Sequence, residues 1–324
     1  MEAILVTGGA GFIGSHVCKS LAKEGYLPVT YDNLCHGHEW AVKWGPLIQK
    51  DLNDSGALDE AIEKYKPVGV IHLASYINAR ESIIDPVRYY LNNVGASLSL
   101  LEAMQRHQIK YLVFSSSASV YGHPQYFPID EKHPTVPTTP YGKSKLVIEE
   151  MLQDLFNAYG LISASLRYFN AAGADADNEI GEAHFPETHL LPLIILTALK
   201  KRSHLTIFGT DHDTEDGTAV RDYIHVSDLA DAHVKTLNWL REHQRNVTLN
   251  LGTGHGYSVQ QAIDQVMHHT SLTIPIKVES SVRGEPPSLV ANASLAKQLL
   301  KWEPKHSSLE NIIKTAWKWH AKTL

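Results

Sequence analysis

Residues 3–14 read Ala3-Ile-Leu-Val-Thr-Gly-Gly-Ala-Gly-Phe-Ile-Gly14, and a helical pattern follows through Lys23. The apolar run that ends at Thr7 predicts a short buried strand. Gly8, Gly11 and Gly14 then recur at every third position, which lets the backbone turn tightly, approach a pyrophosphate closely and pack a helix against the strand. The stretch therefore predicts a strand, a glycine turn and a helix whose N-terminus stabilises a bound phosphate.

An acidic residue follows at the distance that a dinucleotide site requires. Val29-Thr-Tyr-Asp32 is typical of a second strand, and Asp32 lies eighteen residues beyond Gly14. Its carboxylate is suited to accept hydrogen bonds from an adenosine ribose and would repel a 2'-phosphate. The pattern predicts NAD rather than NADP as the cofactor. The alternative is that Asp32 and Asn33 simply form a turn.

Helical and apolar segments alternate through the first half of the chain. We expect helices over about 56–65 and 85–107, strands over 47–48, 68–73, 111–114 and 162–166, and a helix from Pro140 that stops at Gly160. This order predicts an α/β fold with a doubly wound parallel (Rossmann) sheet. The alternation weakens after Asn170, where we expect a second, smaller mixed α/β substrate domain with a helix over 186–201 and strands over 205–209 and 274–278.

The domain boundaries follow from these patterns. We assign residues 1–170 and about 226–255 to the NAD-binding domain, because the segment 247–254 is typical of a strand and turn that rejoin the large sheet. About 171–225 and 256–324 form the second domain, with helices over 258–269 and 309–321, whereas the helix expected over 228–240 belongs to the NAD-binding domain. No internal repeat or low-complexity run interrupts this division.

A tyrosine and a lysine share one face of the predicted helix at Pro140. Proline is favoured at the first helical position, and Tyr141 and Lys145 are four residues apart. Ser117 follows the apolar run 111–114, so its hydroxyl should lie at the carboxyl end of a strand, where ligands bind. A nearby ammonium, together with an oxidised nicotinamide, favours the phenolate form of a tyrosine and makes it a base. The alternative is a surface tyrosine beside a solvated lysine.

Composition excludes several classes of function. The chain has 324 residues, 43% of them hydrophobic, and a net charge of −6, which argues against binding to nucleic acid. No run of about 20 apolar residues predicts a membrane span. Cys18 and Cys35 are too few for a disulfide framework, so we expect a cytoplasmic protein. The nineteen histidines are scattered, and we expect no metal site.

With these segments in place, the chain resembles the UDP-glucose 4-epimerases, also called UDP-galactose 4-epimerases, of the extended short-chain dehydrogenase/reductase superfamily. The resemblance covers nearly the whole length and is carried by five motifs, which span residues 5–14, 114–122, 140–145, 166–170 and 214–226. It implies reversible 4-epimerisation of UDP-glucose and UDP-galactose through a 4-keto intermediate, with tightly bound NAD. It also implies a homodimer that takes a UDP-hexose as its substrate.

The resemblance assigns roles residue by residue. The chemistry would fall to Tyr141, Lys145 and Ser117. The NAD site would be lined by Gly8, Gly11, Phe12, Ile13, Gly14, Asp32, Asn33, Asp51, Leu52, Leu73, Ala74, Asn93, Ser115, Tyr141, Lys145 and Tyr168. The UDP-hexose would be held by Ser117, Tyr141, Phe169, Asn170, His189, Phe208, Arg221, Arg283, Glu285 and Leu289.

Three positions depart from the family pattern. Ile77 stands where some members place a lysine beside the cofactor, and Arg283 is a single, displaced arginine where many members carry two. Leu289 occupies a position where some members have a tyrosine beside carbon 2 of the sugar, so a leucine there leaves room for an acetamido group.

Three alternative functions can be compared with these residues. The departure at Leu289 keeps open a UDP-N-acetylglucosamine 4-epimerase or a bifunctional epimerase. A related 4,6-dehydratase needs an acid/base pair directly after the catalytic hydroxyl residue, and Ala118 and Ser119 do not supply one. A non-catalytic NAD-binding protein is disfavoured because the tyrosine, the lysine and the serine are all present.

Overall fold

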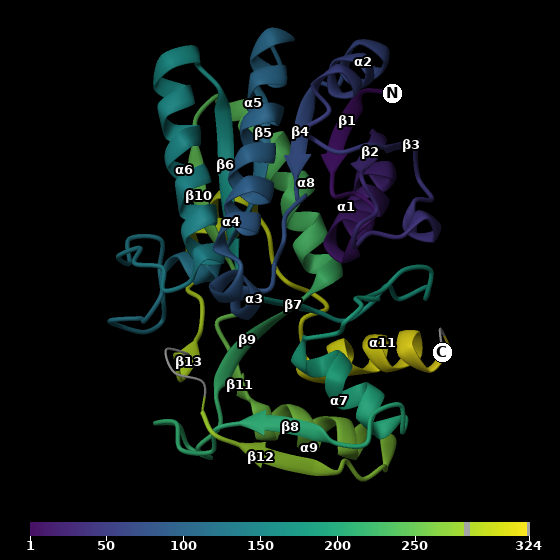
Figure 1. Cartoon of the computed structure of the whole chain (residues 1–324), viewed down its shortest axis with the longest axis vertical. Coiled ribbons are helices and arrows are strands. Elements are labelled where there is room, and N and C mark those ends of the chain that lie inside the picture. The colour runs from purple at the N-terminus through teal and green to yellow at the C-terminus, as the bar shows by residue number, and fades with distance from the viewer. Residues whose placement is uncertain (282–285, 323–324) are drawn as a thin grey trace.

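A seven-stranded parallel sheet forms the centre of the larger lobe (Figure 1). The structure, a computed structural model, describes residues 1–281 and 286–322. The strands of this sheet lie in the order β10-β6-β5-β4-β1-β2-β3, and every neighbouring pair is parallel. Their bounds are β1 Ala3–Thr7, β2 Leu27–Asp32, β3 Leu47–Gln49, β4 Gly69–His72, β5 Tyr111–Ser117, β6 Ile162–Tyr168 and β10 Val247–Leu251. The predicted doubly wound sheet is confirmed.

Helices cover both faces of this sheet and bury both sets of strand side chains. Ile4 and Val6 pack in one hydrophobic core, whereas Ala3 and Leu5 pack in another. Because successive side chains of a strand point to opposite faces, such a doubly covered strand is apolar at nearly every position. The first core contains α1 (Phe12–Lys23), α8 (Val226–His243) and α10 (Ser294–Leu300), and the second contains α2 (Ser55–Tyr65), α5 (Ala96–Arg106) and α6 (Pro140–Tyr159).

The smaller lobe is built on two short sheets. One has the order β11-β9-β13 with β7 also paired to β9, and the other pairs β8 with β12. Its strands are β7 Asn170–Ala172, β8 Leu205–Phe208, β9 Val220–His225, β11 Gly256–Ser258, β12 Ile276–Glu279 and β13 Ser288–Leu289. The helices α7 (Leu190–Ala198), α9 (Val259–Thr270) and α11 (Leu309–Lys322) share a third core with β7, β8, β9 and β11.

The structure corrects the helical segment predicted over 85–107. An extra helix, α3 (Ala79–Ile84), precedes it because Asn78 caps the chain there by accepting bonds from the backbone N–H groups of Arg80 and Glu81. The predicted segment itself consists of α4 (Pro86–Tyr89), a π-helical turn at Tyr90–Gly95 and α5. Short 3₁₀ turns lie at Glu39–Ala41 and Ala118–Val120. Within the described residues, no helix combines the length and apolarity that crossing a membrane requires.

Candidate active site

The glycine turn brings the backbone of two strands close together at the carboxyl edge of the sheet. Gly8 has a φ of +72°, and a Cβ there would lie 2.6 Å from the backbone nitrogen of Ala74, which follows β4. A Cβ on Gly14 would lie 2.1 Å from the carbonyl oxygen of Gly8. Only glycine fits both positions. The first turn of α1 therefore opens directly on the cavity beyond the strands, where its free N–H groups can hold a phosphate.

Asp32 is fixed at the end of β2 with its carboxylate beside this turn. The backbone N–H of Ala10 donates to Oδ2 at 3.0 Å, and that of Leu34 donates to Oδ1 at 2.8 Å. Burial raises the pKa of Asp32, and the two backbone hydrogen bonds oppose that rise. Asn33 donates to Oδ2 of Asp51 at 2.8 Å, which ties the ends of β2 and β3 together. The carboxylate lies where a ribose acceptor is expected.

A cavity of about 530 Å³ lies against the carboxyl ends of β1, β2, β4, β5 and β6. In an open α/β sheet this edge, where the strand order reverses, is the usual ligand site. The cavity brings together most of the predicted residues: Gly8, Gly11, Phe12, Ile13, Gly14, Asp32, Asn33, Asp51, Leu52, Leu73, Ala74, Ser115, Ser117, Tyr141, Tyr168, Phe169, Asn170 and His189.

Five predicted residues do not line that cavity: Asn93, Lys145, Phe208, Arg221 and Leu289. Arg283 and Glu285 lie outside the described residues. Arg221 and Leu289 are paired across β9 and β13, and Leu289 packs against the cluster that contains Phe169. Phe208 contacts the guanidinium group of Arg80, 4.5 Å from its ring centroid, so it connects β8 to α3 of the larger lobe.

The predicted start of the catalytic helix is confirmed. Thr139 caps α6 by accepting a hydrogen bond from the Gly142 N–H at 3.2 Å, and Pro140 occupies the first turn. The backbone N–H of Tyr141 also donates to the Ser82 hydroxyl at 3.1 Å. Lys145 is buried, and its Nζ lies 5.8 Å from the centroid of the Tyr141 ring. Nζ donates to the carbonyl oxygen of Ser115 at 2.8 Å.

Burial dominates the electrostatics of Tyr141 and Lys145. Burial raises the pKa of Tyr141, although the hydrogen bond with the Ser117 hydroxyl opposes the rise. Burial also lowers the pKa of Lys145 to about 7, against the field of Glu149. Desolvation penalises the charged forms of both side chains, so the ammonium group by itself does not bring the pKa of Tyr141 below its ordinary value. The charge of an oxidised nicotinamide is the further contribution that the phenolate needs.

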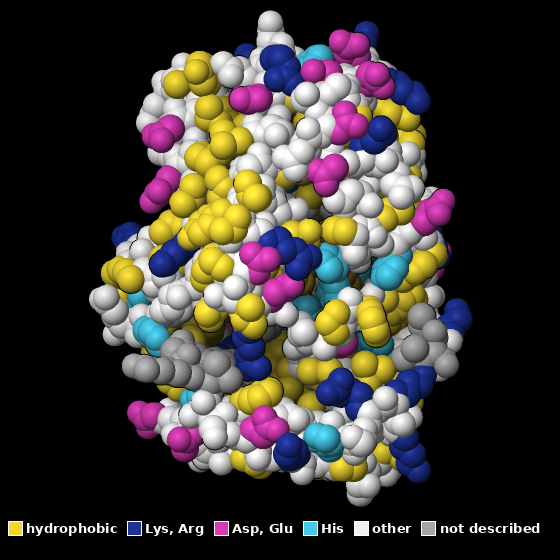
Figure 2. Space-filling view, in the orientation of Figure 1, with side chains coloured by type: hydrophobic (Ala, Val, Ile, Leu, Met, Phe, Trp, Pro, Cys, Tyr) yellow, Lys and Arg dark blue, Asp and Glu magenta, His cyan; other side chains and the backbone are white. Residues whose placement is uncertain are grey.

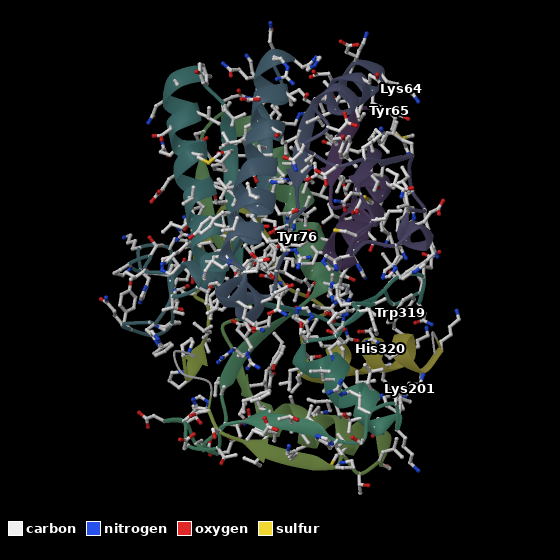
Figure 3. All side chains as sticks on the ribbon, viewed as in Figure 1. Lys64, Tyr65, Tyr76, Lys201, Trp319 and His320 are labelled. Carbon is white, nitrogen blue, oxygen red and sulfur yellow. The ribbon has the colours of Figure 1, made fainter. Side chains whose placement is uncertain are left out.

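Asn93 supports the cavity wall from behind. Its side chain is buried in the π-helical turn, where Oδ1 accepts from the Tyr76 N–H at 2.9 Å and Nδ2 donates to the Tyr76 carbonyl at 3.1 Å. Nδ2 also donates to Ser144 of α6 at 3.1 Å. Tyr76 lies near the middle of the molecule (Figure 3) and lines the cavity. Asn93 thus fixes the loop after β4, and its amide has the partners that burial demands.

Sequence reasoning missed a segment that forms the opposite wall. Glu182, His184, Phe185, Pro186 and Thr188 line the cavity beside His189. The sequence offers one indirect indication of this wall, which is that the regular pattern of strands and helices breaks down after Asn170. The loop residues Cys35, His36 and Gly37 were also missed, although they follow the predicted acid at Asp32.

This wall carries a cluster of acids and histidines in which Glu182 is buried and the other three residues are partly exposed. His189 Nδ1 lies 2.8 Å from Oε1 of Glu182 and 3.0 Å from Oε1 of Glu187, and His184 Nδ1 lies 3.1 Å from Glu182. The carboxylates raise the pKa of His189 to about 10, against burial, and the histidines hold the pKa of Glu182 well below its usual range. The cluster therefore favours the protonated imidazolium of His189, and the Glu182 carboxylate that pairs with it also lines the cavity.

Comparison with known proteins gives the family. Residues 4–252 match the model of the NAD dependent epimerase/dehydratase family. The chain belongs to this family. The NAD dependent epimerase/dehydratase match spans the glycine turn, Ser117, Tyr141 and β10, so it covers the whole large sheet.

Individual members of the NAD dependent epimerase/dehydratase family match over nearly the full length. A UDP-glucose 4-epimerase of Rhizobium leguminosarum bv. trifolii is 47% identical over 99% of this chain and 98% of its own. That of Rhizobium meliloti (strain 1021) is 48% identical over 98% of this chain and 97% of its own. The crystal structure of UDP-glucose 4-epimerase from Brucella ovis in complex with NAD has a TM-score of 0.96, with 46% identity over 98% of each chain. The resemblance inferred from the motifs is confirmed.

Proposed function

We propose that the protein interconverts UDP-glucose and UDP-galactose by reversible epimerisation at carbon 4, using tightly bound NAD. The observation that carries this proposal is the position of Tyr141 and Ser117 on the wall of the cavity that the glycine turn also lines. A proton acceptor and a dinucleotide site thus share one enclosed space. Proteins named UDP-glucose 4-epimerase match nearly the whole chain, which supports the same reaction.

The residues present fit NAD. The first turn of α1 can hold the pyrophosphate, the Asp32 carboxylate can accept bonds from the adenosine ribose, and Asp51 and Leu52 lie where the adenine would extend. Ser115 and Tyr168, joined by a hydrogen bond between their hydroxyl groups, line the opposite end near Lys145. When bound, NAD takes up a hydride from carbon 4 of the sugar and returns it to the opposite face.

The protein's own groups manage the proton and the orientation of the sugar. Tyr141 takes the proton of the 4-hydroxyl group while the hydride leaves carbon 4, and these two losses together give a 4-keto sugar. When the hydride returns to carbon 4, Tyr141 gives a proton back to the 4-oxygen. Ser117 hydrogen-bonds that oxygen, and the ammonium group of Lys145 binds the nicotinamide ribose. His189 contributes an imidazolium to the UDP side of the cavity, while Phe169 and Asn170 lie at its sugar end. We infer that Arg221 and Arg283 complete the diphosphate site, and Leu289 the carbon 2 side.

The alternatives are weaker. The full-length relatives named above are UDP-glucose 4-epimerases, which favours the glucose and galactose pair over N-acetylated sugars. Dehydration would need an acid/base pair after Ser117, but Ala118 is apolar and Ser119 carries only a hydroxyl group.

We also propose a homodimer formed through the outer helices of the larger lobe. Ile84, Val87, Leu91 and Leu98 are between 46% and 85% exposed on α3, α4, the π-helical turn and α5. Figure 2 shows a band of hydrophobic side chains over α5 and α6 on the same part of the molecule. A contiguous apolar patch of this kind is typical of an interface between subunits. The free thiols of Cys18 and Cys35 suit a cytoplasmic location.

The division into an NAD-binding and a substrate domain also remains our proposal. It is supported by the separate sheets, since β10 joins the large sheet whereas β9 and β11 belong to the small one.

The direct test is to incubate the purified protein with UDP-galactose, UDP-glucose and their N-acetylated counterparts, without added cofactor, and to separate the products. We expect conversion of UDP-galactose and UDP-glucose into the same mixture from either side, with no net change in NADH absorbance. A protein that retains NAD but converts none of these sugars would refute the proposed function.

A further inference from the structure

A buried ion pair lies one helical turn beyond Lys145. Glu149 on α6 receives hydrogen bonds from Arg167 on β6, with Nε to Oε1 at 3.0 Å and Nη2 to Oε2 at 2.5 Å. The two side chains are only 9% and 8% exposed. The hydroxyl of Ser116 on β5 also donates to Oε1 at 2.5 Å. The carboxylate is therefore held rigidly between three elements of the larger lobe.

This carboxylate is anchored further across the sheet. Nη1 of Arg167 donates to the Tyr121 hydroxyl at 3.1 Å, and that hydroxyl donates to Oδ1 of Asn250 on β10 at 2.6 Å. Asn250 in turn donates to the Ile129 carbonyl at 2.9 Å. Replacing a buried ion pair by apolar groups often costs little stability, so stability alone is a weak reason for such a construction.

Among the side chains around Lys145, Glu149 carries the negative charge. Tyr141, Lys145 and Glu149 recur every four residues, so they share the buried face of α6. From the sheet, His72 on β4, Phe114 and the Ser115 carbonyl on β5, and Arg167 on β6 face this region. His72 is neutral because burial lowers its pKa to about 3, and its two ring nitrogens bond to Thr7 and Ser97.

Glu149 lies one helical turn from Lys145 on the same face of α6, where its carboxylate favours the charged form of the lysine. The field of Glu149 opposes the desolvation that pulls the pKa of Lys145 down to about 7. Arg167 binds this carboxylate through Nε and Nη2. A neutral lysine could still donate a hydrogen bond, but it could no longer stabilise the phenolate of Tyr141.

We propose that Glu149 is a positioning residue for the epimerisation: its carboxylate, held by Arg167 and Ser116, keeps Lys145 a cation beside Tyr141. The proposal rests on the proposed function of the site. Glu149 thus joins Tyr141 and Lys145 as a third member of the set. It touches neither the sugar nor the cofactor and acts only through Lys145.

The test is the pH dependence of turnover in Glu149→Gln. Gln has nearly the same shape but no charge, so Lys145 should lose its proton at a lower pH. We expect kcat for UDP-galactose to fall about 10-fold to 100-fold near pH 8, and the alkaline limb of the profile to move down by about one unit or more. The deficit should shrink as the pH falls toward about 6, where Lys145 regains its proton.

Three further variants separate this role from packing. Glu149→Asp keeps the charge and should restore the alkaline limb, and Glu150→Gln, an exposed neighbour on α6, should match the wild type. The double variant Glu149→Gln with Arg167→Gln leaves no buried charge unpaired. We expect the double variant to be more thermally stable and to retain more NAD than Glu149→Gln alone. Its pH profile of turnover should nevertheless stay shifted.

The outcomes are distinct. Recovery of the wild-type profile in the double variant would show that the ion pair only supports packing and would overturn the proposal. A profile of Glu149→Gln that is lowered equally at every pH would also overturn it. A wild-type protein without epimerase activity would instead refute the proposed function, and with it any role of Glu149 in that reaction.

Discussion

Lys19 and Asp175 form a buried ion pair across 156 residues of sequence, with 2.8 Å between Nζ and Oδ1. The same ammonium group also binds Asp177 at 3.0 Å and Glu179 at 2.7 Å. Lys19 lies on α1, whose N-terminus faces the cofactor cavity, and the three acids lead into the wall formed by Glu182 and His189. One side chain thus connects the phosphate end of the cavity to its opposite wall.

Removing this cation should loosen the wall. In Lys19→Met, Asp175 remains buried without its partner, which we expect to lower the free energy of unfolding by about 3–5 kcal/mol. The wall should then release NAD more readily. Thermal unfolding and the dinucleotide content after gel filtration measure the two effects. Lys23→Met, at the exposed end of the same helix, should change neither, and an equal loss in both variants would contradict the role of Lys19.

Tyr141→Phe should remove most of the turnover and leave the fold intact. The variant loses one hydroxyl group from the cavity wall, and the loss of a general base typically costs about 100-fold to 10,000-fold in kcat. NAD content and thermal stability should stay near the wild type. Tyr159→Phe, which is 62% exposed at the other end of α6, provides the control. A Tyr141→Phe protein with the wild-type rate would exclude the tyrosine from the chemistry.

The pairing of His189 with Glu182 predicts a specific pH dependence of stability. The pKa of His189 rises from 6.5 to about 10, so the folded state binds its proton more tightly than the unfolded state. This contribution is complete below pH 6.5 and is lost as the pH rises to about 10. The pKa of Glu182 is lowered, so its contribution is present above pH 4.5 and is lost as the pH falls further.

Denaturant unfolding of wild type and His189→Asn as a function of pH measures this contribution. The difference between the two proteins should be large near neutral pH and should shrink toward pH 10. His255→Asn, at an exposed position, should track the wild type throughout. A difference that is constant across this range would show that the imidazolium contributes nothing to folding.

Asp32 should determine which dinucleotide the protein retains. Denatured wild-type protein should release NAD and no NADP, because the carboxylate would repel a 2'-phosphate. Asp32→Asn loses a charged acceptor, and such hydrogen bonds are worth about 1.5–3 kcal/mol, so NAD affinity should fall about 10-fold to 100-fold. Fluorescence titration of the stripped proteins gives both affinities. Equal NAD and NADP affinities in the wild type would rule out this role.

The exposed apolar helices predict the oligomeric state. Leu91→Glu places a charge in the middle of the proposed interface and should convert the dimer into monomers, because burying an unpaired charge is costly. Sedimentation velocity distinguishes the two states. Leu272→Glu adds the same charge at a leucine that is 38% exposed outside the patch and should remain dimeric. Monomeric wild-type protein at micromolar concentration would contradict the interface.

Sequence patterns predicted the structure correctly where residues close together in the chain determine it. Gly8 and Gly14 are required by the close approach of the backbone, and Pro140 with Thr139 defines the start of α6 within one turn. The short strands β7, β11 and β13 were not predicted, because two or three residues carry no periodicity and form only when β9 lies beside them. Long-range pairing determines such elements.

The candidate site shows the same difference between features that local sequence predicts and features that long-range contacts determine. Tyr141 and Asp32 were predicted from spacing, but the direction of the pKa shift of Tyr141 depends on burial, which spacing does not report. Lys19 has the sequence context of an ordinary lysine near a helix end, and its role depends on acids that the fold brings from residues 175–179.

The path of the chain between its sheets has a consequence for how such proteins diversify. The chain leaves the large sheet at β6, enters the small sheet at β7 and β9, returns through α8 and β10, and leaves again at β11. No single recombination point separates the two lobes, so a transplanted lobe would need several compatible junctions at once. We expect new sugar preferences to arise by point substitution inside the cavity, and gene shuffling to yield mostly misfolded hybrids.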